Sequence, residues 1–167
     1  MNETFSKFKT PDWLVGIGVL VALIAMFLPW YSVSINTSGV SGVSGVELSS
    51  SVDGFHNWGI LSFIAILAVG GLFALRTFGS SNQAALPVED WLAYAIGGGV
   101  IVLGAVIFWL ETGGGESNAY ASAGPDFGLF IAIAAGIAVA AGGIMLKSAA
   151  ASSGAGTTPS TPAPPAP

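Results

Sequence analysis

The chain has 167 residues, of which 53% are hydrophobic and only 8% are charged, and it contains no cysteine. Because a soluble domain usually carries about 25% charged residues, this composition argues against a water-soluble fold. The lack of cysteine excludes disulfides, thiolate metal sites and cysteine nucleophiles, and the net charge of −5 does not suit nucleic-acid binding.

Four long uncharged segments dominate the sequence. They comprise residues 13–30, 58–75, 91–110 and 127–146, and each is 18 to 20 residues long. A helix of about 20 residues is roughly 30 Å long, which matches the hydrocarbon core of a bilayer. We therefore predict an all-α membrane protein, with four transmembrane helices packed as a bundle within residues 1–147 and surrounded by the lipid bilayer.

The basic residues predict the orientation of this bundle. All of them fall on one side of a four-span chain, namely Lys7, Lys9, Arg76 and Lys147. The opposite loops, residues 31–57 and 111–126, contain no lysine or arginine. Since basic residues near spans mark the cytoplasmic side, we predict a multi-pass protein of the plasma membrane with both termini in the cytoplasm.

A short motif occurs twice. Asp-Trp-Leu stands at residues 12–14 and again at 90–92, each time where a span begins at the cytoplasmic face. The returning spans also open alike, with Trp58-Gly59 and Phe127-Gly128. These echoes predict a duplicated helical hairpin, related by an axis along the membrane normal. Alternatively, both are interface signals, because aspartate caps helices and tryptophan favours the headgroup region.

In the first outer loop the apolar residues no longer form a continuous run but alternate with polar ones. Tyr31, Val33 and Ile35 alternate with serines, a glycine-rich segment follows at 38–46, and Leu48 resumes an alternating pattern. This pattern predicts a small β-hairpin. The second outer loop contains three consecutive glycines and predicts no regular element. Residues 148–167, rich in Ala, Ser, Thr and Pro, predict a disordered cytoplasmic tail.

The spans offer little for chemistry. Membrane enzymes and ion pathways need ionisable groups at membrane depth, and the four segments contain none away from their ends. We therefore expect no enzymatic activity, no cofactor and no metal. His56, beside Asp53 at the predicted outer face, could respond to pH, although an ordinary interfacial role is favoured. One histidine with one nearby carboxylate falls short of a metal site.

Small residues recur at four-residue spacing in every span, which lets helix backbones approach closely. The residues predicted to mediate this packing are Gly18, Ala22, Gly70, Ala74, Ala95, Gly99, Gly128, Ala132, Gly136 and Ala140. Aromatic residues near the span ends predict anchors in the headgroup region. These predicted anchors are Trp13, Trp30, Tyr31, Trp58, Trp91 and Trp109.

Four spans with a strand-bearing first outer loop resemble the claudin and tetraspan architectures in topology. The sequence departs from claudins because "PWYSVS" is not their Trp-Gly-Leu-Trp motif and the loop cysteines are absent. The run "FLPWYSVS", a Gly-Ser-Val loop and then "WGILSF" is also similar to small uncharacterised four-span bacterial membrane proteins. That resemblance covers the first two spans and implies no activity.

Three functions are compatible with these features. The favoured one is a non-catalytic accessory or scaffold subunit of a membrane complex, with a protein partner in the membrane or at the outer face. A small transporter or channel, acting as a homo-oligomer, is the first alternative. An envelope sensor that uses the outer loop and His56 is the second.

Overall fold

The computed structural model describes residues 10–36, 47–79, 88–113, 115–117 and 121–154. Within these ranges the chain forms the helices α2 (Thr10–Ala25), α3 (Gly59–Phe78), α4 (Asp90–Glu111) and α5 (Phe127–Gly154). The last three are long and apolar enough to cross a membrane, and α2 is a shorter apolar helix. The predictions for residues 38–46, for Lys7 and Lys9, and for the tail beyond residue 154 lie outside the described ranges.

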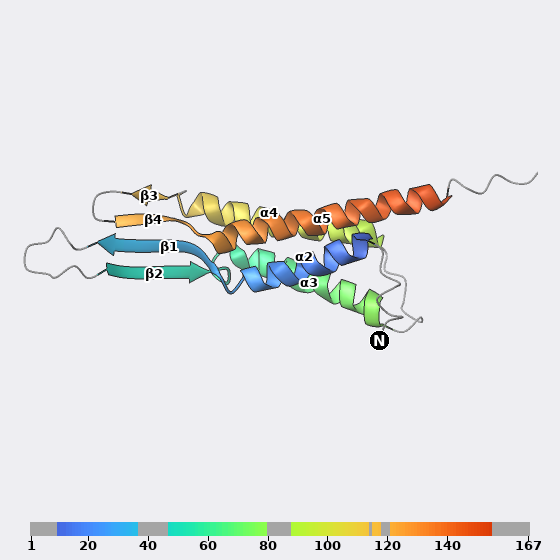
Figure 1. The fold of residues 1–167 in the computed structure, drawn as a ribbon, viewed down its shortest axis with the longest axis horizontal. Coiled ribbons are helices and arrows are strands. Elements are labelled where there is room, and N and C mark those ends of the chain that lie inside the picture. Colours follow the sequence, from blue (N-terminus) through green and yellow to red (C-terminus); the bar gives the residue numbers. More distant parts are fainter. Residues whose placement is uncertain (1–9, 37–46, 80–87, 114, 118–120, 155–167) are drawn as a thin grey trace, which may run out of the picture.

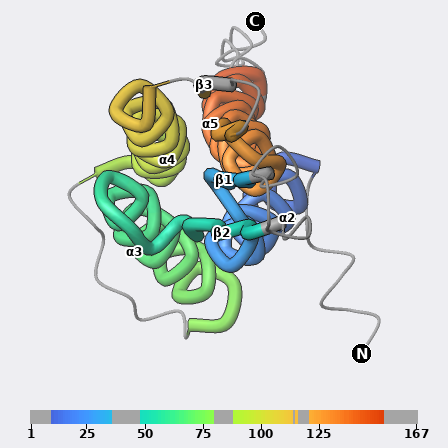
Figure 2. The backbone as a smooth tube through the Cα atoms, turned by 90° about the vertical axis from the view of Figure 1, so that its left-hand side faces the viewer, coloured from blue at the N-terminus to red at the C-terminus, as the bar shows by residue number. Residues whose placement is uncertain are grey.

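The helices form a ring in chain order (Figure 2). α2 packs against α5, α5 against α4, and α4 against α3, while α3 closes the ring on α2 through a smaller contact. Each helix therefore has two helical neighbours and one face turned outward. This arrangement agrees with the predicted packing of apolar helices.

A four-stranded antiparallel sheet continues the bundle at one end (Figure 1). Its strands are β1 (Pro29–Asn36), β2 (Glu47–Asp53), the two-residue β3 (Glu116–Ser117) and β4 (Ala121–Pro125), in the order β2-β1-β4-β3. The predicted β-hairpin of the first outer loop is confirmed by β1 and β2. The prediction that the second outer loop lacks regular structure is wrong, because β4 pairs with the open edge of β1.

The first predicted span, residues 13–30, is longer than the helix that forms. α2 ends at Ala25, and the strand β1 begins at Pro29. Proline has no backbone N–H, and it disfavours the helical conformation of the residue before it. Trp30 donates from Nε1 to the Ala25 carbonyl at 2.8 Å, so its side chain satisfies an acceptor at the helix end. The apolar run of the sequence extends beyond the end of α2 because the first residues of β1 also lie inside the bundle.

The other helices lie close to the predicted spans. α3 and α4 begin within one residue of the predicted positions, and α4 ends within one residue. α5 runs to Gly154, well beyond the predicted end of the span at residue 146. Residues 148–154, predicted as the start of the tail, are therefore helical.

The main core lies where the helices meet the sheet. Trp30 is fully buried, and its ring packs edge-on against Phe108 of α4 with centroids 5.3 Å apart. Ser62 is the buried polar side chain in the described part of the chain, and its hydroxyl donates to the Ile101 carbonyl at 2.9 Å. The surrounding buried residues come from every helix, including Ala22, Ile66, Ile101, Leu129 and Ala132.

Small residues lie at the closest helix contacts. Gly136 of α5 faces the backbone of Gly98 on α4, and Gly18 of α2 faces Val139 of α5. Among the other residues predicted for packing, Ala22, Gly128 and Ala132 are buried, and Gly70, Ala95 and Ala140 are partly buried. Gly99 faces open space, however, and Ala74 is exposed. On α4 the close contact is made by Gly98 instead, one residue away from the predicted position.

Candidate functional site

The sheet has two chemically different faces. Side chains alternate along a strand, and residues paired across antiparallel strands share a face. The observed register places Tyr31, Val33 and Ile35 on one face with Leu48, Ser50 and Val52 of β2, so this face is apolar except for Ser50. Ala121, Ala123 and Pro125 of β4 join them. The opposite face carries the serines Ser32, Ser34, Ser49, Ser51 and Ser122.

The apolar face is uncovered at the end farthest from the helices. Ile35 and Leu48 are cross-strand partners, and their side chains are 45% and 59% exposed. Nearer the bundle, Tyr31 and Val52 are partly buried and pack against the main core. On the serine face, the hydroxyls of Ser34 and Ser122 lie 2.7 Å apart and form a hydrogen bond. The sheet thus presents an exposed apolar pair at its tip, which we call the tip pair.

The sheet is held firmly on the bundle through the first residues of β1. Trp30 accepts a backbone hydrogen bond from Asp126, at the start of α5, at 2.9 Å. Gly54, which follows β2, donates to the Met26 carbonyl at 3.1 Å. A Cβ on Gly54 would lie 2.6 Å from the Trp30 ring, so only glycine fits there without displacing the indole. These contacts join strands and helices into one packed unit around Trp30.

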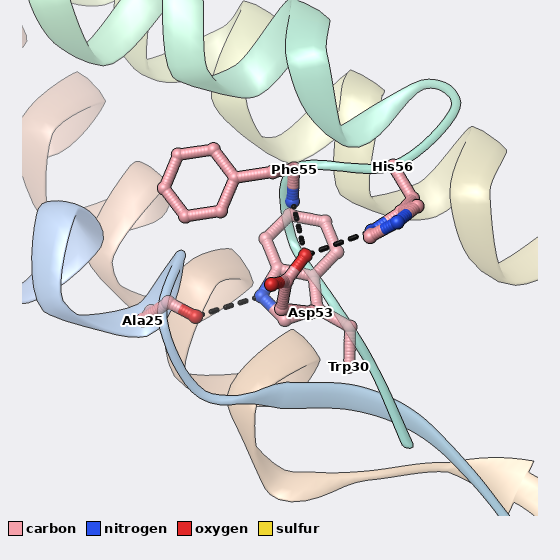
Figure 3. Close-up of polar contacts among 5 residues, drawn as sticks. All are labelled: Ala25, Trp30, Asp53, Phe55 and His56. Carbon is pink, nitrogen blue, oxygen red and sulfur yellow. Dashed lines mark hydrogen bonds and ion pairs between the residues drawn. The ribbon is translucent and has the colours of Figure 1, made fainter. Parts of the chain in front are cut away.

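The predicted outer-face pair, Asp53 and His56, does come together (Figure 3). Asp53 Oδ1 lies 2.8 Å from His56 Nδ1, and it also accepts the backbone N–H of Phe55 at 3.1 Å. Both side chains are partly exposed. An aspartate that accepts the N–H two residues on is typical of an Asx turn. The contacts of this pair are therefore those of the turn that joins β2 to α3.

No group of three or more His, Cys, Asp or Glu side chains that could hold a metal ion is found in the part of the chain that the structure describes. Asp53 and His56 form a pair only, and the Phe55 ring beside them packs edge-on between Phe27 and Phe63.

The predicted headgroup anchors occupy different environments. Trp13, Trp58 and Trp109 are 44%, 44% and 37% exposed, which suits a position against lipid headgroups. Trp30 is instead fully buried in the core, and Tyr31 is half-buried on the sheet. Trp91 is partly buried, and the Lys147 ammonium lies 4.2 Å from its ring centroid, within cation–π range.

An ion pair links α3 and α4 at the end of the bundle opposite the sheet. Arg76 in the last turn of α3 lies 2.6 Å from Asp90 in the first turn of α4. The sequence predicts a helix cap at Asp90 and not this ion pair, whereas Glu89 is the residue at the N-cap position. The signal was available in principle, since Arg76 and Asp90 flank one short connection between antiparallel spans.

No protein-family model matches the chain, and no curated protein matches it. The architecture itself defines the class: three membrane-length apolar helices and a shorter apolar helix packed together, with a small sheet at one end. This combination is consistent with a small multi-pass membrane protein. Apolar outer faces of the helices also favour contact with a lipid bilayer.

Proposed function

We propose that this chain is a non-catalytic accessory or scaffold subunit of a membrane complex, which binds a protein partner through the apolar face of its sheet. The observation that carries the proposal is the tip pair, Ile35 and Leu48, which lies exposed on a sheet fixed to the bundle. An exposed apolar patch on a fixed scaffold commonly marks an interaction surface. A partner that covered the pair would remove both side chains from water.

The edge of the sheet adds a second means of recognition. β2 lies at one edge in the observed order, so one side of its backbone has no strand beside it within the described residues. Such an edge can accept a strand from another chain, with side chains on alternate faces giving specificity. The tip pair and the β2 edge adjoin each other, which favours one partner that contacts both.

The packed axis of the bundle supports an interaction role over the transporter alternative. Trp30, Phe108 and Met26 are fully buried between the helices, where a path through a single chain would have to run. A transport path would therefore have to form between copies of the chain. The sensor alternative receives little support, because the contacts of His56 are those of a turn.

We infer further that all four helices cross the bilayer, that the sheet lies outside the cell and that both termini lie in the cytoplasm. Arg76 lies in the last turn of α3, and Lys147 lies in the half of α5 that is farther from the sheet, as the positive-inside rule requires of a cytoplasmic face. The chain has no cysteine of its own. Single cysteines can therefore report which face is accessible.

Cysteine labelling tests the orientation. Ser49 on β2 and Ser148 near the end of α5 are both exposed. In intact cells, Ser49→Cys should react with a membrane-impermeant thiol reagent, while Ser148→Cys should react only after the membrane is permeabilised. The reverse pattern would place the sheet in the cytoplasm.

The duplicated hairpin remains a proposal with mixed support. The order helix, two strands, helix occurs twice along the chain. A twofold repeat would exchange β1 with β3 and β2 with β4, so the central pair of the sheet would be either β1 with β3 or β2 with β4. The central pair is β1 and β4 instead. The order of elements along the chain favours duplication, whereas the order of strands in the sheet does not.

Substitution of the tip pair tests the proposed function. Ile35→Asn with Leu48→Asn should leave membrane insertion intact but abolish co-purification of the main partner in mild detergent. The matched control is Ser34→Asn with Ser49→Asn, the adjacent cross-strand pair on the opposite face. Both double variants place two asparagines on the same two strands, and the tip-pair variant loses more strand propensity because isoleucine favours strands. The control should retain the partner.

Deletion of residues 155–167 separates recognition at the sheet from recognition in the cytoplasm. We expect this deletion to leave the partner bound. If the tip-pair variant retains the partner and the deletion loses it, the sheet is not the binding surface.

A further inference from the structure

An apolar groove runs along the outer surface of the bundle between α3 and α4. Its volume is about 570 Å³, and one stripe of residues on each helix lines it. On α3 the stripe runs from Leu61 to Leu72 through Ala65 and Ala68, and on α4 it runs through Ala93 and Gly97. These small side chains create the hollow between larger neighbours. Gly97 forms part of its floor, since a Cβ there would lie 2.1 Å from Val69.

The dimensions of the groove suit an acyl chain. Its volume of about 570 Å³ is within the range of about 300–1,000 Å³ found for ligand sites. From Leu61 to Leu72 a helix rises about 16 Å. This length is close to the roughly 15 Å that one leaflet contributes to a hydrocarbon core of about 30 Å.

One end of the groove is polar. The lining stripe on α3 continues one turn beyond Leu72 to Arg76, and the stripe on α4 begins one turn after Glu89 and Asp90. Arg76 and Asp90 form the ion pair that joins these helices, and both side chains are more than a third exposed. Glu89 is exposed as well, and its carboxylate accepts a hydrogen bond from Trp91. The groove therefore ends at the Arg76 guanidinium and the carboxylates of Glu89 and Asp90, with the Lys147 ammonium beyond the Trp91 ring.

Apolar contact alone does not select an occupant in a membrane. Lipid tails are as apolar as leucine, so a groove gains little by exchanging one chain for another. Selection must come from the polar end. Arg76 adjoins Asp90 there, and Lys147 adjoins Glu89 only across the Trp91 ring, so a headgroup that carries only negative charge brings no cation to these two carboxylates. The polar end suits a headgroup that carries an ammonium group beside its phosphate.

We propose that the groove between α3 and α4 binds one phospholipid with an ethanolamine headgroup. One acyl chain lies along the groove, the phosphate contacts Arg76, and the ammonium group contacts Glu89 and Asp90. The guanidinium has five N–H donors, so its bond to Asp90 leaves donors for a phosphate. This site is independent of the sheet surface that binds the protein partner.

Binding of synthetic lipids to the purified full-length chain tests the site. The delipidated protein in detergent is mixed with equal amounts of dioleoyl phosphatidylethanolamine and dioleoyl phosphatidylglycerol, and bound lipid is counted by native mass spectrometry. One molecule of the ethanolamine lipid should be retained. It should be preferred by about three- to fivefold, a ratio that partly exposed ionic contacts can supply.

Two variants locate the lipid. Ala68→Phe fills the groove and should lose the bound lipid, whereas Ala134→Phe, an exposed position on α5 outside the groove, should retain it. Glu89→Gln removes one carboxylate without changing the groove and should narrow the preference for ethanolamine. The last variant keeps the test valid if Ala68→Phe lowers the melting temperature.

Three results would overturn the assignment. Equal lipid retention by wild type and by folded Ala68→Phe would place the lipid elsewhere. Equal retention of the two lipids by the wild type would remove the role of the polar end. Unchanged lipid binding together with loss of a co-purifying membrane protein from Ala68→Phe would show that a partner helix occupies the groove.

Discussion

Gly98→Leu should destabilise the protein by about 3 kcal/mol or more, at or above the upper end of the usual cost of overpacking. Gly98 lies where α4 and α5 approach each other through their backbones. A Cβ at this position would lie 2.5 Å from the Ala140 nitrogen and 2.6 Å from the Gly136 carbonyl oxygen. Both are backbone atoms of a regular helix, so neither can move aside as a side chain can. The two helices would have to separate.

Gly99→Leu provides a matched control one residue away. A Cβ on Gly99 would meet no atom within 4 Å. Leucine also favours a helix over glycine by nearly 1 kcal/mol, so this variant should be as stable as the wild type or slightly more stable. Thermal unfolding in one detergent compares the two variants directly. Similar melting temperatures for both would mean that α4 and α5 do not pack through Gly98.

Trp30→Ala should cost about 3–5 kcal/mol, the usual range for removing a buried large aromatic side chain. Trp30 is fully buried, and among the residues that the structure describes it has the largest of the fully buried side chains. The substitution removes the edge-on contact with Phe108 and leaves the Ala25 carbonyl without its indole donor. It also opens a cavity beside Gly54, where the sheet joins the bundle. We expect the sheet to lose its fixed orientation as well.

The control for Trp30→Ala is Trp13→Ala, at a position that is 44% exposed. It removes the same side chain from the bundle surface and should lower the melting temperature much less. Limited proteolysis in detergent provides a second measurement, because a loosened sheet should be cut faster in β1 or β2. Equal effects of the two substitutions would contradict the central position of Trp30.

The sequence predicted the helices well because uncharged runs of membrane length leave few other solutions. The first predicted helix was too long at its end, because it included Pro29 and Trp30, which belong to β1. In composition these residues resemble the apolar end of a span, followed by an interface tryptophan. Composition does not reveal that β1 begins inside the bundle, between α2, α4 and α5. A proline at a helix end was the local signal for the boundary.

The sheet shows how pairing can override local preference. The alternation in β1 was readable, since Tyr31, Val33 and Ile35 are residues that favour strands. Residues 121–125, "ASAGP", carry little strand preference of their own, yet they form β4 because β1 provides an edge with matching hydrogen-bond groups. Such a strand depends on a partner far away in sequence, which a local pattern cannot supply.

The candidate sites were only partly predictable for the same reason. Alternation marked Ile35 and Leu48 as apolar positions of two strands, but their pairing and their exposure depend on the register of the sheet and on where the helices end. Prediction of the groove requires knowledge of which faces of α3 and α4 adjoin. Small residues alone do not mark it, because they are common throughout this chain. The contact between Arg76 and Asp90 likewise needs the relative rotation of two helices.

The shortness of α2 has a consequence for the surrounding bilayer. Its 16 residues rise about 24 Å, less than the roughly 30 Å of a hydrocarbon core. The backbone that completes this side, residues 26–30, is not helical, and such backbone is tolerated at membrane depth only where protein covers it. Here Met26 and Trp30 are buried, and their carbonyls accept hydrogen bonds from Gly54 and Asp126.

If α2 crosses the membrane with the other helices, the bundle presents a short side beside a long one. The 28 residues of α5 rise about 42 Å. The bilayer beside α2 would then have to become thinner, or the whole bundle would tilt toward that side. Either response costs fractions of a kcal/mol per Å of hydrophobic mismatch. Such an uneven boundary makes the protein sensitive to bilayer thickness, and it would favour membrane regions that are thinner than average.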